Sequence, residues 1–331
     1  MSYPITGAAI ANCLGTDNRT VLDRAFAGTA AFSPASAYCD VPFETVLGVM
    51  PVLPAEGLAC VMTRVAQIAF ASVAQLQLAA TIERWGAGRV AYVFASSTGG
   101  LEETERALAP QPSLPMTAAY SYANHGVDAT TPAIMQYLGI AGVHLAISTA
   151  CSSGLKALAS AIRLIDRGLA DAVVVGSADS LCRTTVFGFH SLGLTAPTAT
   201  QPFSKDRAGL TLGEGSAYVV IEREASQALA TLGGTGAASD AFHHTSPHPE
   251  GLGGQVCMRE ALDRAKLSPN EISYVSAHGT GRPNASRRIE FEVDRLFHVG
   301  GRTHFHLLAD TEVYRQMSTW LANAPAQSTA N

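Results

Sequence analysis

Five short runs of apolar residues constrain the fold of this chain more than any other feature. They lie at residues 89–95, 143–148, 171–176, 216–222 and 272–277. Uninterrupted stretches, such as the VVV in the third run, are typical of strands that are covered on both faces. The sequence therefore predicts a sheet that is buried between layers of helices.

Helical periodicity separates these runs. Between the second and third runs, apolar side chains recur at the spacing of one helix face. They are Leu155, Leu158, Ile162 and Ile165. Gly168 follows at the position of a C-terminal cap, and a shorter helix is expected over residues 258–266. Strands that alternate with helices predict an α/β protein, here one compact body of two related halves.

The composition fits a globular protein with a large core. Of the 331 residues, 47% are hydrophobic and 15% are charged, which argues against wholesale disorder. The formal net charge is −5 and there is no basic run, so nucleic-acid binding is not expected. The N-terminus lacks the pattern of a signal peptide, and no segment reaches transmembrane length. We therefore expect a cytosolic protein without a membrane span.

The six cysteines are widely spaced, and no two of them form a CxxC pair. In a cytosolic chain this argues against disulfides and against a zinc site. The long polar stretch at residues 233–254 holds His243, His244 and His248, but no pattern of cysteines or carboxylates completes a metal site there. We predict neither a metal nor a bound cofactor.

Residues 146–156, AISTACSSGLK, hold the most informative cysteine. An apolar strand ends here, small residues follow, and a helix begins close to Cys151, an arrangement analogous to a nucleophile elbow. Free N–H groups at a helix N-terminus stabilise a thiolate and can bind an oxyanion. Small neighbours such as Ala150 and Gly154 leave room for an acyl chain. A buried cysteine that only packs is the alternative for an isolated residue of this kind.

Several motifs, in the right order, resemble those of the β-ketoacyl synthases, which are condensing enzymes of the thiolase fold. STACSSG around Cys151 resembles their active-site motif, and SSTGG at residues 96–100 resembles their glycine-rich turn. The segment at 202–222, PFSKDRAGLTLGEGSAYVVIE, resembles their PFD…RDG…GEGAG segment. AHGTG at 277–281 resembles the motif with the first catalytic histidine, here His278.

The resemblance covers residues 1–283 and indicates the KAS I/II type of β-ketoacyl-[acyl-carrier-protein] synthase. DSLCRTTVFGFHSLGLTAP and SDAFHHTSPHPEGLG are similar to sequences of a bacterial aryl-polyene-type subgroup. A thiolase is disfavoured, because thiolases lack the combination of HGTG with GEGSA.

The resemblance implies a fold of two pseudo-duplicated halves that form a five-layer αβαβα sandwich. We expect an N-terminal half with the nucleophile at residues 1–225, a partial C-terminal half with the HGTG motif at 226–298, and a divergent tail at 299–331. The C-terminal half is therefore expected to be incomplete. The implied partners are acyl carrier protein and a second subunit, in a homodimer or in a heterodimer with a related synthase.

The same resemblance implies a decarboxylative Claisen condensation. An acyl group moves from acyl carrier protein to Cys151, malonyl-carrier protein loses CO₂, and the resulting carbanion attacks the thioester. His278 follows the predicted strand at 272–277 and would hydrogen-bond the malonyl thioester oxygen as it becomes an enolate. A satisfied structural histidine is the alternative for this residue.

Other residues are assigned supporting roles. Four charged residues of the family motif are expected to shape the site entrance and hold the fold: Lys205, Asp206, Arg207 and Glu214. A solvated charge cluster is the alternative for the three adjacent residues at 205–207. Phe187, Phe189 and His190 are assigned to the acyl pocket, to a dimer interface or to the core.

The C-terminal sequence departs from the family pattern. From Val299 onward there is no TGH motif, no matching Lys and no glycine-rich strand, and Ala285 and Ser286 stand where an acidic partner is expected. None of the later histidines is assigned as the second catalytic histidine; they are His298, His304 and His306. Losing one oxyanion donor costs roughly 10²–10³ in rate. Full elongation activity therefore does not follow from Cys151 and His278 alone. A natural truncation and an altered reading frame would each explain the abrupt loss of similarity at the C-terminal end.

Three hypotheses remain open. The leading one is a β-ketoacyl synthase with Cys151 as its nucleophile. The second is a non-catalytic or impaired partner subunit like a chain-length factor, although such subunits usually lack the cysteine that this chain has. The third is an inactive truncated remnant.

Overall fold

The computed structural model describes residues 2–51, 63–108, 121–242 and 248–281. The chain divides into two compact units, and each is described by itself. The larger unit comprises residues 3–199 and 211–232. The smaller unit comprises Ser2, residues 200–210 and the described residues from 233 onward.

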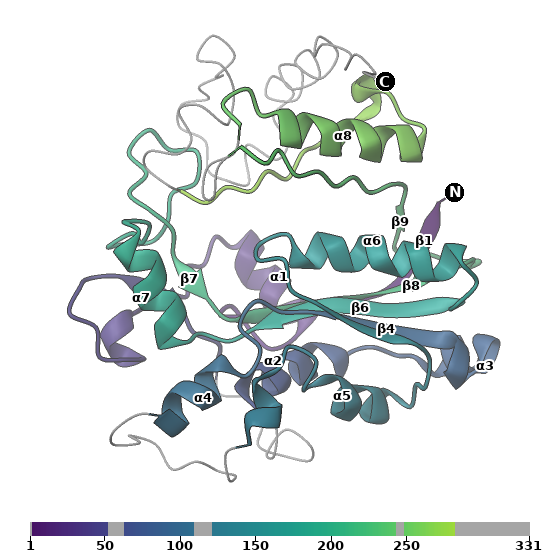
Figure 1. Ribbon diagram of the computed structural model, residues 1–331, viewed down its shortest axis with the longest axis horizontal. Helices are drawn as coiled ribbons and strands as arrows, with labels where there is room; N and C mark the ends of the chain where they lie inside the picture. The colour runs from purple at the N-terminus through teal and green to yellow at the C-terminus, as the bar shows by residue number, and fades with distance from the viewer. Residues whose placement is uncertain (1, 52–62, 109–120, 243–247, 282–331) are drawn as a thin grey trace. The chain divides into compact units, whose positions relative to one another are not determined.

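A six-stranded sheet forms the centre of the larger unit, in the order β5-β4-β6-β8-β1-β9 (Figure 1). Its strands are β1 (Tyr3–Asn12), β4 (Val90–Ala95), β5 (His144–Ile147), β6 (Ala172–Asp179), β8 (Gly215–Glu222) and β9 (Ala230–Leu232). β4 lies parallel to β5 and to β6, whereas β8 is antiparallel to both β6 and β1, and β9 is antiparallel to β1. The carboxyl ends of β4, β5 and β6 therefore meet at one end of the sheet.

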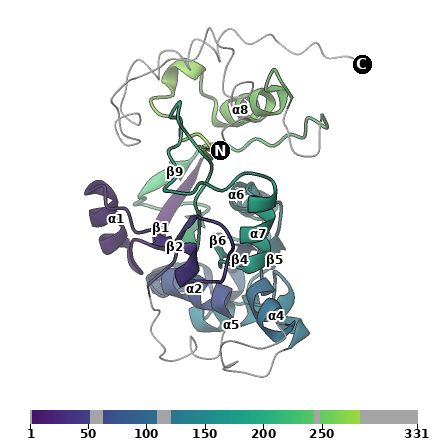
Figure 2. The same ribbon diagram turned by 90° about the vertical axis from the view of Figure 1, so that its left-hand side faces the viewer.

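Helices cover both faces of this sheet, as Figures 1 and 2 show. One face packs against α2 (Arg64–Val73), α3 (Ala79–Trp85) and α5 (Thr131–Leu138), and the other packs against α6 (Ser153–Asp166). All six residues of β4 are buried: Tyr92 and Phe94 belong to the cluster with α2 and α5, and Val93 belongs to the cluster with α6. The α/β prediction and the first four predicted strands are confirmed.

Helix α6 also confirms the prediction made from its apolar periodicity. Ile162 and Ile165 are buried against the sheet, but Leu155 is exposed on the first turn of the helix. Gly168 adopts φ = 66°, and the N–H of Leu169 donates to the carbonyl of Leu164 at 2.9 Å. A left-handed glycine with this bond satisfies the last carbonyls of a helix and ends it.

The remaining elements of the larger unit surround this core. The further helices are α1 (Asn18–Phe26), α4 (Leu101–Leu108) and α7 (Arg183–Ser191), with 3₁₀ turns at Ala35–Ala37, Ala87–Arg89 and Tyr122–His125. A small sheet joins β2 (Ser33–Pro34), β3 (Val46–Gly48) and β7 (Leu212–Gly213). Within the described ranges, no helix is long and apolar enough to cross a membrane.

The smaller unit holds α8 (Leu252–Ala265) and a 3₁₀ turn at Pro269–Glu271. The helix predicted at 258–266 is confirmed, but it begins earlier, at Leu252. The strand predicted at 272–277 is wrong for the described chain, because none of these residues is paired in a strand. A strand needs a hydrogen-bonded neighbour as well as an apolar pattern, and the described part of this unit offers no such neighbour. The tail predicted at 299–331 lies outside the described residues.

Candidate active site

Cys151 lies in the turn between β5 and α6, so the predicted strand–turn–helix arrangement around it is confirmed. β5 ends at Ile147, α6 begins at Ser153, and the cysteine side chain between them is exposed. This exposure disagrees with the alternative of a buried packing cysteine. Ala150, directly before it, has φ = 52°, a left-handed conformation that costs an L-residue roughly 1–2 kcal/mol. The tight turn presents the thiol at the carboxyl end of the parallel strands.

Two serine hydroxyl groups close this turn. The Ser153 Oγ accepts a hydrogen bond from the Thr149 N–H at 2.8 Å and donates one to the Ala150 carbonyl at 2.6 Å. The Ser152 Oγ donates to the Thr149 carbonyl at 2.8 Å. Ser153 is buried and Ser152 is exposed. The backbone on both sides of Ala150 is thus held by side chains that follow Cys151 in the sequence.

The glycine-rich turn at residues 96–100 lies at the same end of the sheet, after β4. The Ser96 N–H donates to the carbonyl of Ile147, the last residue of β5, at 3.1 Å. One carboxylate oxygen of Asp179, at the end of β6, accepts four hydrogen bonds from this turn. The donors are the Ser96 and Thr98 hydroxyls and the Ser97 and Thr98 N–H groups, at 2.7–2.9 Å. Asp179 therefore fixes the turn beside the strand that leads to Cys151.

This turn also depends on a close approach of two backbones. A Cβ added at Gly100 would lie only 1.8 Å from the Asn124 carbonyl oxygen. No side chain fits at that distance, so a glycine is required where the turn passes residues 121–126.

His278 lies in the smaller unit, whereas Cys151 lies in the larger one, so each is described within its own unit. His278 is exposed, and the two glycines that follow it both have positive φ. A Cβ at Gly281 would meet the Thr200 Oγ1 at 2.4 Å and the Gly209 carbonyl oxygen at 2.5 Å. The HGTG segment therefore packs closely on residues 200–210, which include the letters KDRAG of the motif at 202–222.

Glu214 is a buried charged residue of the motif at 202–222. Its side chain is fully buried and forms a forked ion pair with Arg64: Nη2 to Oε2 at 2.6 Å and Nε to Oε1 at 3.1 Å. The Met50 N–H also donates to this carboxylate, at 3.0 Å. Lys205 and Asp206 are exposed, and Arg207 donates to the Ser204 carbonyl.

Glu102 on α4 lies near this ion pair. It is buried and paired with Arg106 on the next turn of the helix. Burial raises the pKa of the Glu102 carboxyl to about 7, Arg106 opposes the rise, and the negative charges of Glu103 and Glu214 add to it. Folding therefore favours the protonated form of this carboxyl.

Because the pKa of Glu102 is raised in the folded state, we expect this residue to add to the free energy of unfolding at low pH and to lose that contribution as the pH rises. Between the unfolded value of 4.5 and the folded value of about 7, the native state binds the proton more tightly. The contribution of Glu102 is therefore fully present below pH 4.5 and is lost as the pH rises through about 7. One pKa unit corresponds to about 1.4 kcal/mol, so the difference between 4.5 and about 7 corresponds to at most about 3.5 kcal/mol.

Urea unfolding on both sides of this pH window measures the effect. Glu102→Gln should show a flatter pH dependence than the wild type, and Glu83→Gln, at an exposed helix position, serves as the matched control. An unchanged pH dependence in Glu102→Gln would contradict the prediction.

Comparison with known proteins decides the family. Residues 59–227 match the N-terminal domain of β-ketoacyl synthases, and residues 229–299 match their C-terminal domain. The chain belongs to the β-ketoacyl synthase family.

Relatives of this synthase-family chain support the same conclusion. A 3-oxoacyl-[acyl-carrier-protein] synthase 2 from Staphylococcus aureus is 35% identical over 168 residues, which are 47% of this chain and 42% of that protein. The chain thus spans less than half the length of this curated relative. The solved ketosynthase ApeO, in complex with its chain length factor ApeC from Xenorhabdus doucetiae, is 33% identical with a TM-score of 0.79, over 87% of this chain and 74% of that one. The ishigamide ketosynthase/chain length factor is 25% identical with a TM-score of 0.72, over 87% and 75%. The thiolase-like layered fold is confirmed.

The aromatic residues of α7 form contacts within this synthase unit. Phe43 stacks on His190 with ring centres 3.4 Å apart, and meets Phe187 edge-on at 5.4 Å. Two of the three aromatic residues singled out from the sequence thus hold the segment before β3 against α7.

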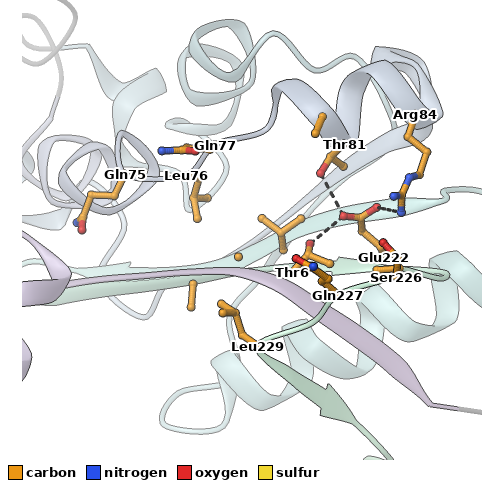
Figure 3. Close-up of a pocket in the computed structure, with 15 residues that line it drawn as sticks. Thr6, Gln75, Leu76, Gln77, Thr81, Arg84, Glu222, Ser226, Gln227 and Leu229 are labelled. Carbon is orange, nitrogen blue, oxygen red and sulfur yellow. Dashed lines mark hydrogen bonds and ion pairs between the residues drawn. The ribbon is translucent and has the colours of Figure 1, made fainter.

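A cavity of about 450 Å³ in the larger unit lies away from Cys151. In Figure 3, Thr6, Thr81 and Arg84 converge on Glu222 within it. Glu222 pairs with Ala172 at the beginning of β6, whereas Cys151 follows the carboxyl end of β5, which is aligned with β6 through β4. This cavity is therefore at the opposite end of the sheet and does not serve the cysteine.

Sequence reasoning missed Ser153, Asp179 and Arg64. The motif letters around Cys151 include Ser153, but only the folded turn shows what its hydroxyl binds. Asp179 and Arg64 act on segments that are distant in sequence, and no local pattern could have indicated their partners.

Proposed function

We propose that this chain is a β-ketoacyl-[acyl-carrier-protein] synthase that carries an acyl group on Cys151. The observation that carries the proposal is an exposed cysteine in a tight strand–turn–helix junction, within the part that matches the N-terminal synthase domain. The printed name of the Staphylococcus aureus relative, a 3-oxoacyl-[acyl-carrier-protein] synthase, supports the same activity.

The proposed reaction has two steps. The Cys151 thiolate attacks the carbonyl carbon of an acyl-carrier-protein thioester, a new thioester forms on Cys151, and the carrier thiol leaves. Malonyl-carrier protein then loses CO₂, and the electron pair of the broken C–C bond attacks the thioester carbonyl. The Cys151 thiolate leaves, and the β-ketoacyl group remains on the carrier protein.

His278 is proposed to act in the second step. Its ring would donate a hydrogen bond to the malonyl thioester oxygen, where negative charge develops as CO₂ leaves. Gly279 and Gly281, with positive φ on either side of Thr280, support this role because they fix the backbone next to the histidine.

Acyl carrier protein and a second synthase-type subunit are the proposed partners. β5 is an edge strand of the six-stranded sheet, and Leu145 within it and Val143 directly before it are exposed. An apolar edge strand of this kind favours pairing with another chain. Two of the similar solved structures combine a ketosynthase with a chain length factor, which supports a related but different subunit; a second copy of this chain is the other proposed partner for the edge strand.

Intact-protein mass spectrometry tests the proposal. The full chain, alone and co-produced with a related synthase subunit, is incubated with acyl-carrier-protein thioesters. We expect a mass increase of one acyl group, which is lost when malonyl-carrier protein is added and β-ketoacyl-carrier protein appears. An adduct that is not elongated would favour the impaired partner subunit. A folded chain that takes up no acyl group under either condition would contradict the proposed function.

A further inference from the structure

We infer that Ser153 is a positioning residue for Cys151, and that its hydroxyl group sets the geometry of the turn that presents the thiol. This inference rests on the proposed function, in which Cys151 is the nucleophile. Ser153 does not touch the reacting carbon; it acts through the backbone of Thr149 and Ala150.

The hydroxyl bridges two peptide groups on the N-terminal side of the cysteine. Its oxygen accepts the Thr149 N–H at 2.8 Å, and its hydrogen goes to the Ala150 carbonyl at 2.6 Å. The Ser153 N–H donates to the same carbonyl at 3.0 Å. Because that carbonyl belongs to the peptide that leads into Cys151, its orientation fixes the cysteine backbone.

The turn needs this restraint because it is strained. Ala150 has a Cβ and yet adopts φ = 52°, a left-handed conformation that is unfavourable for an L-residue, so a more extended turn would relieve strain. Ser153 is only 5% exposed, so water does not readily replace its bonds. Without the hydroxyl, the Thr149 N–H loses its acceptor, and the turn is free to relax toward ordinary φ values.

Relaxation would move the thiol relative to the carboxyl ends of the strands. A displacement of about 1 Å at a reacting group can cost about a hundredfold in rate. We expect Ser153→Ala to lower the rate of acyl loading by about tenfold or more, with KM for the acyl-carrier protein changed much less than kcat.

Ser152→Ala is the matched control. It removes the other hydroxyl that closes the turn, but Ser152 is exposed, so water can take the place of its hydroxyl at the Thr149 oxygens, and the Ala150 carbonyl keeps its bonds to Ser153. Ser153→Thr is the conservative variant, since it keeps the hydroxyl group. Both should load acyl groups within about threefold of the wild type.

Alkylation by iodoacetamide gives a readout that needs no carrier protein. The Cys151 sulfur attacks the iodoacetamide methylene carbon and iodide leaves, so the rate reports the thiol and its turn directly. The rate at Cys151 is followed by peptide mass mapping, across the pH range in which thiols ionise and beside a thermal melt of each variant. If the proposed function fails, the wild type loads no acyl group, but the alkylation series still tests Ser153.

The expected result is an altered alkylation rate and pH profile in Ser153→Ala, with Ser152→Ala and Ser153→Thr close to the wild type. A folded Ser153→Ala with the wild-type rate and profile would overturn the inference. So would a folded Ser153→Thr that is altered as strongly as Ser153→Ala, because the hydroxyl would then not matter. If Ser153→Ala does not melt cooperatively, Ser153→Thr is compared with the wild type instead. A folded Ser153→Thr with an altered alkylation rate and pH profile then overturns the inference, because it keeps the hydroxyl group.

Discussion

Replacement of Cys151 by alanine is expected to abolish acyl loading from carrier-protein thioesters. The thiol is the atom that forms the new bond, and alanine offers no nucleophile in its place. Because the side chain is exposed, the substitution should change the free energy of unfolding by less than about 0.5 kcal/mol. Intact-protein mass spectrometry should therefore show an acyl adduct on the wild type and none on a variant that melts normally.

Cys39→Ala is the matched control for this experiment. Cys39 is a free, half-buried cysteine in the same unit, and burial raises the pKa of its thiol. A raised pKa leaves less thiolate at neutral pH, so removing Cys39 should leave loading unchanged. An adduct on Cys151→Ala at the wild-type level would assign the nucleophile to another residue.

The local features of the site could be predicted because each depends on neighbours in sequence. The apolar run before Cys151, the small residues around it and the periodicity of α6 are enough to indicate a strand, a turn and a helix. Gly168 shows the same principle, since a C-terminal cap requires only a residue that tolerates positive φ at the end of a helix.

The pairings between distant segments could not be predicted in the same way. Asp179 and Ser96 are 83 positions apart, and Arg64 and Glu214 are 150 positions apart. Each pair meets only because the sheet brings its segments together. The apolar run at 272–277 fails for the related reason that a strand is defined by its neighbour, which the run itself does not specify.

The Arg64–Glu214 ion pair carries the second large prediction. Glu214 has no exposed side-chain surface and Arg64 is only 20% exposed. Removing one charge from such a pair leaves the other buried without its counter-ion, which typically costs 3–5 kcal/mol. We expect Glu214→Gln and Arg64→Met each to lower the free energy of unfolding by about 3–5 kcal/mol in urea titrations.

The double variant separates the ion pair from simple packing damage. With both charges removed, no unpaired charge stays buried, so Arg64→Met/Glu214→Gln should cost clearly less than the sum of the single changes. The exposed pair Arg19–Asp23, at 3.7 Å with 91% and 73% of the two side chains exposed, is the matched control. Asp23→Asn should cost less than about 1 kcal/mol, because solvent screens that pair.

The result bears on the site as well as on stability. Glu214 lies between β7 and β8, and its N–H donates to the Gly48 carbonyl at 2.9 Å, so the ion pair ties α2 to the small sheet that leads into β8. β8 in turn pairs with β6 along its whole length, and β6 ends at Asp179, which holds the glycine-rich turn beside β5. If the single variants instead unfold with the wild-type free energy, this pair does not stabilise the sheet. The presence of a buried glutamate at position 214, in the GEGSA motif, would then need another explanation.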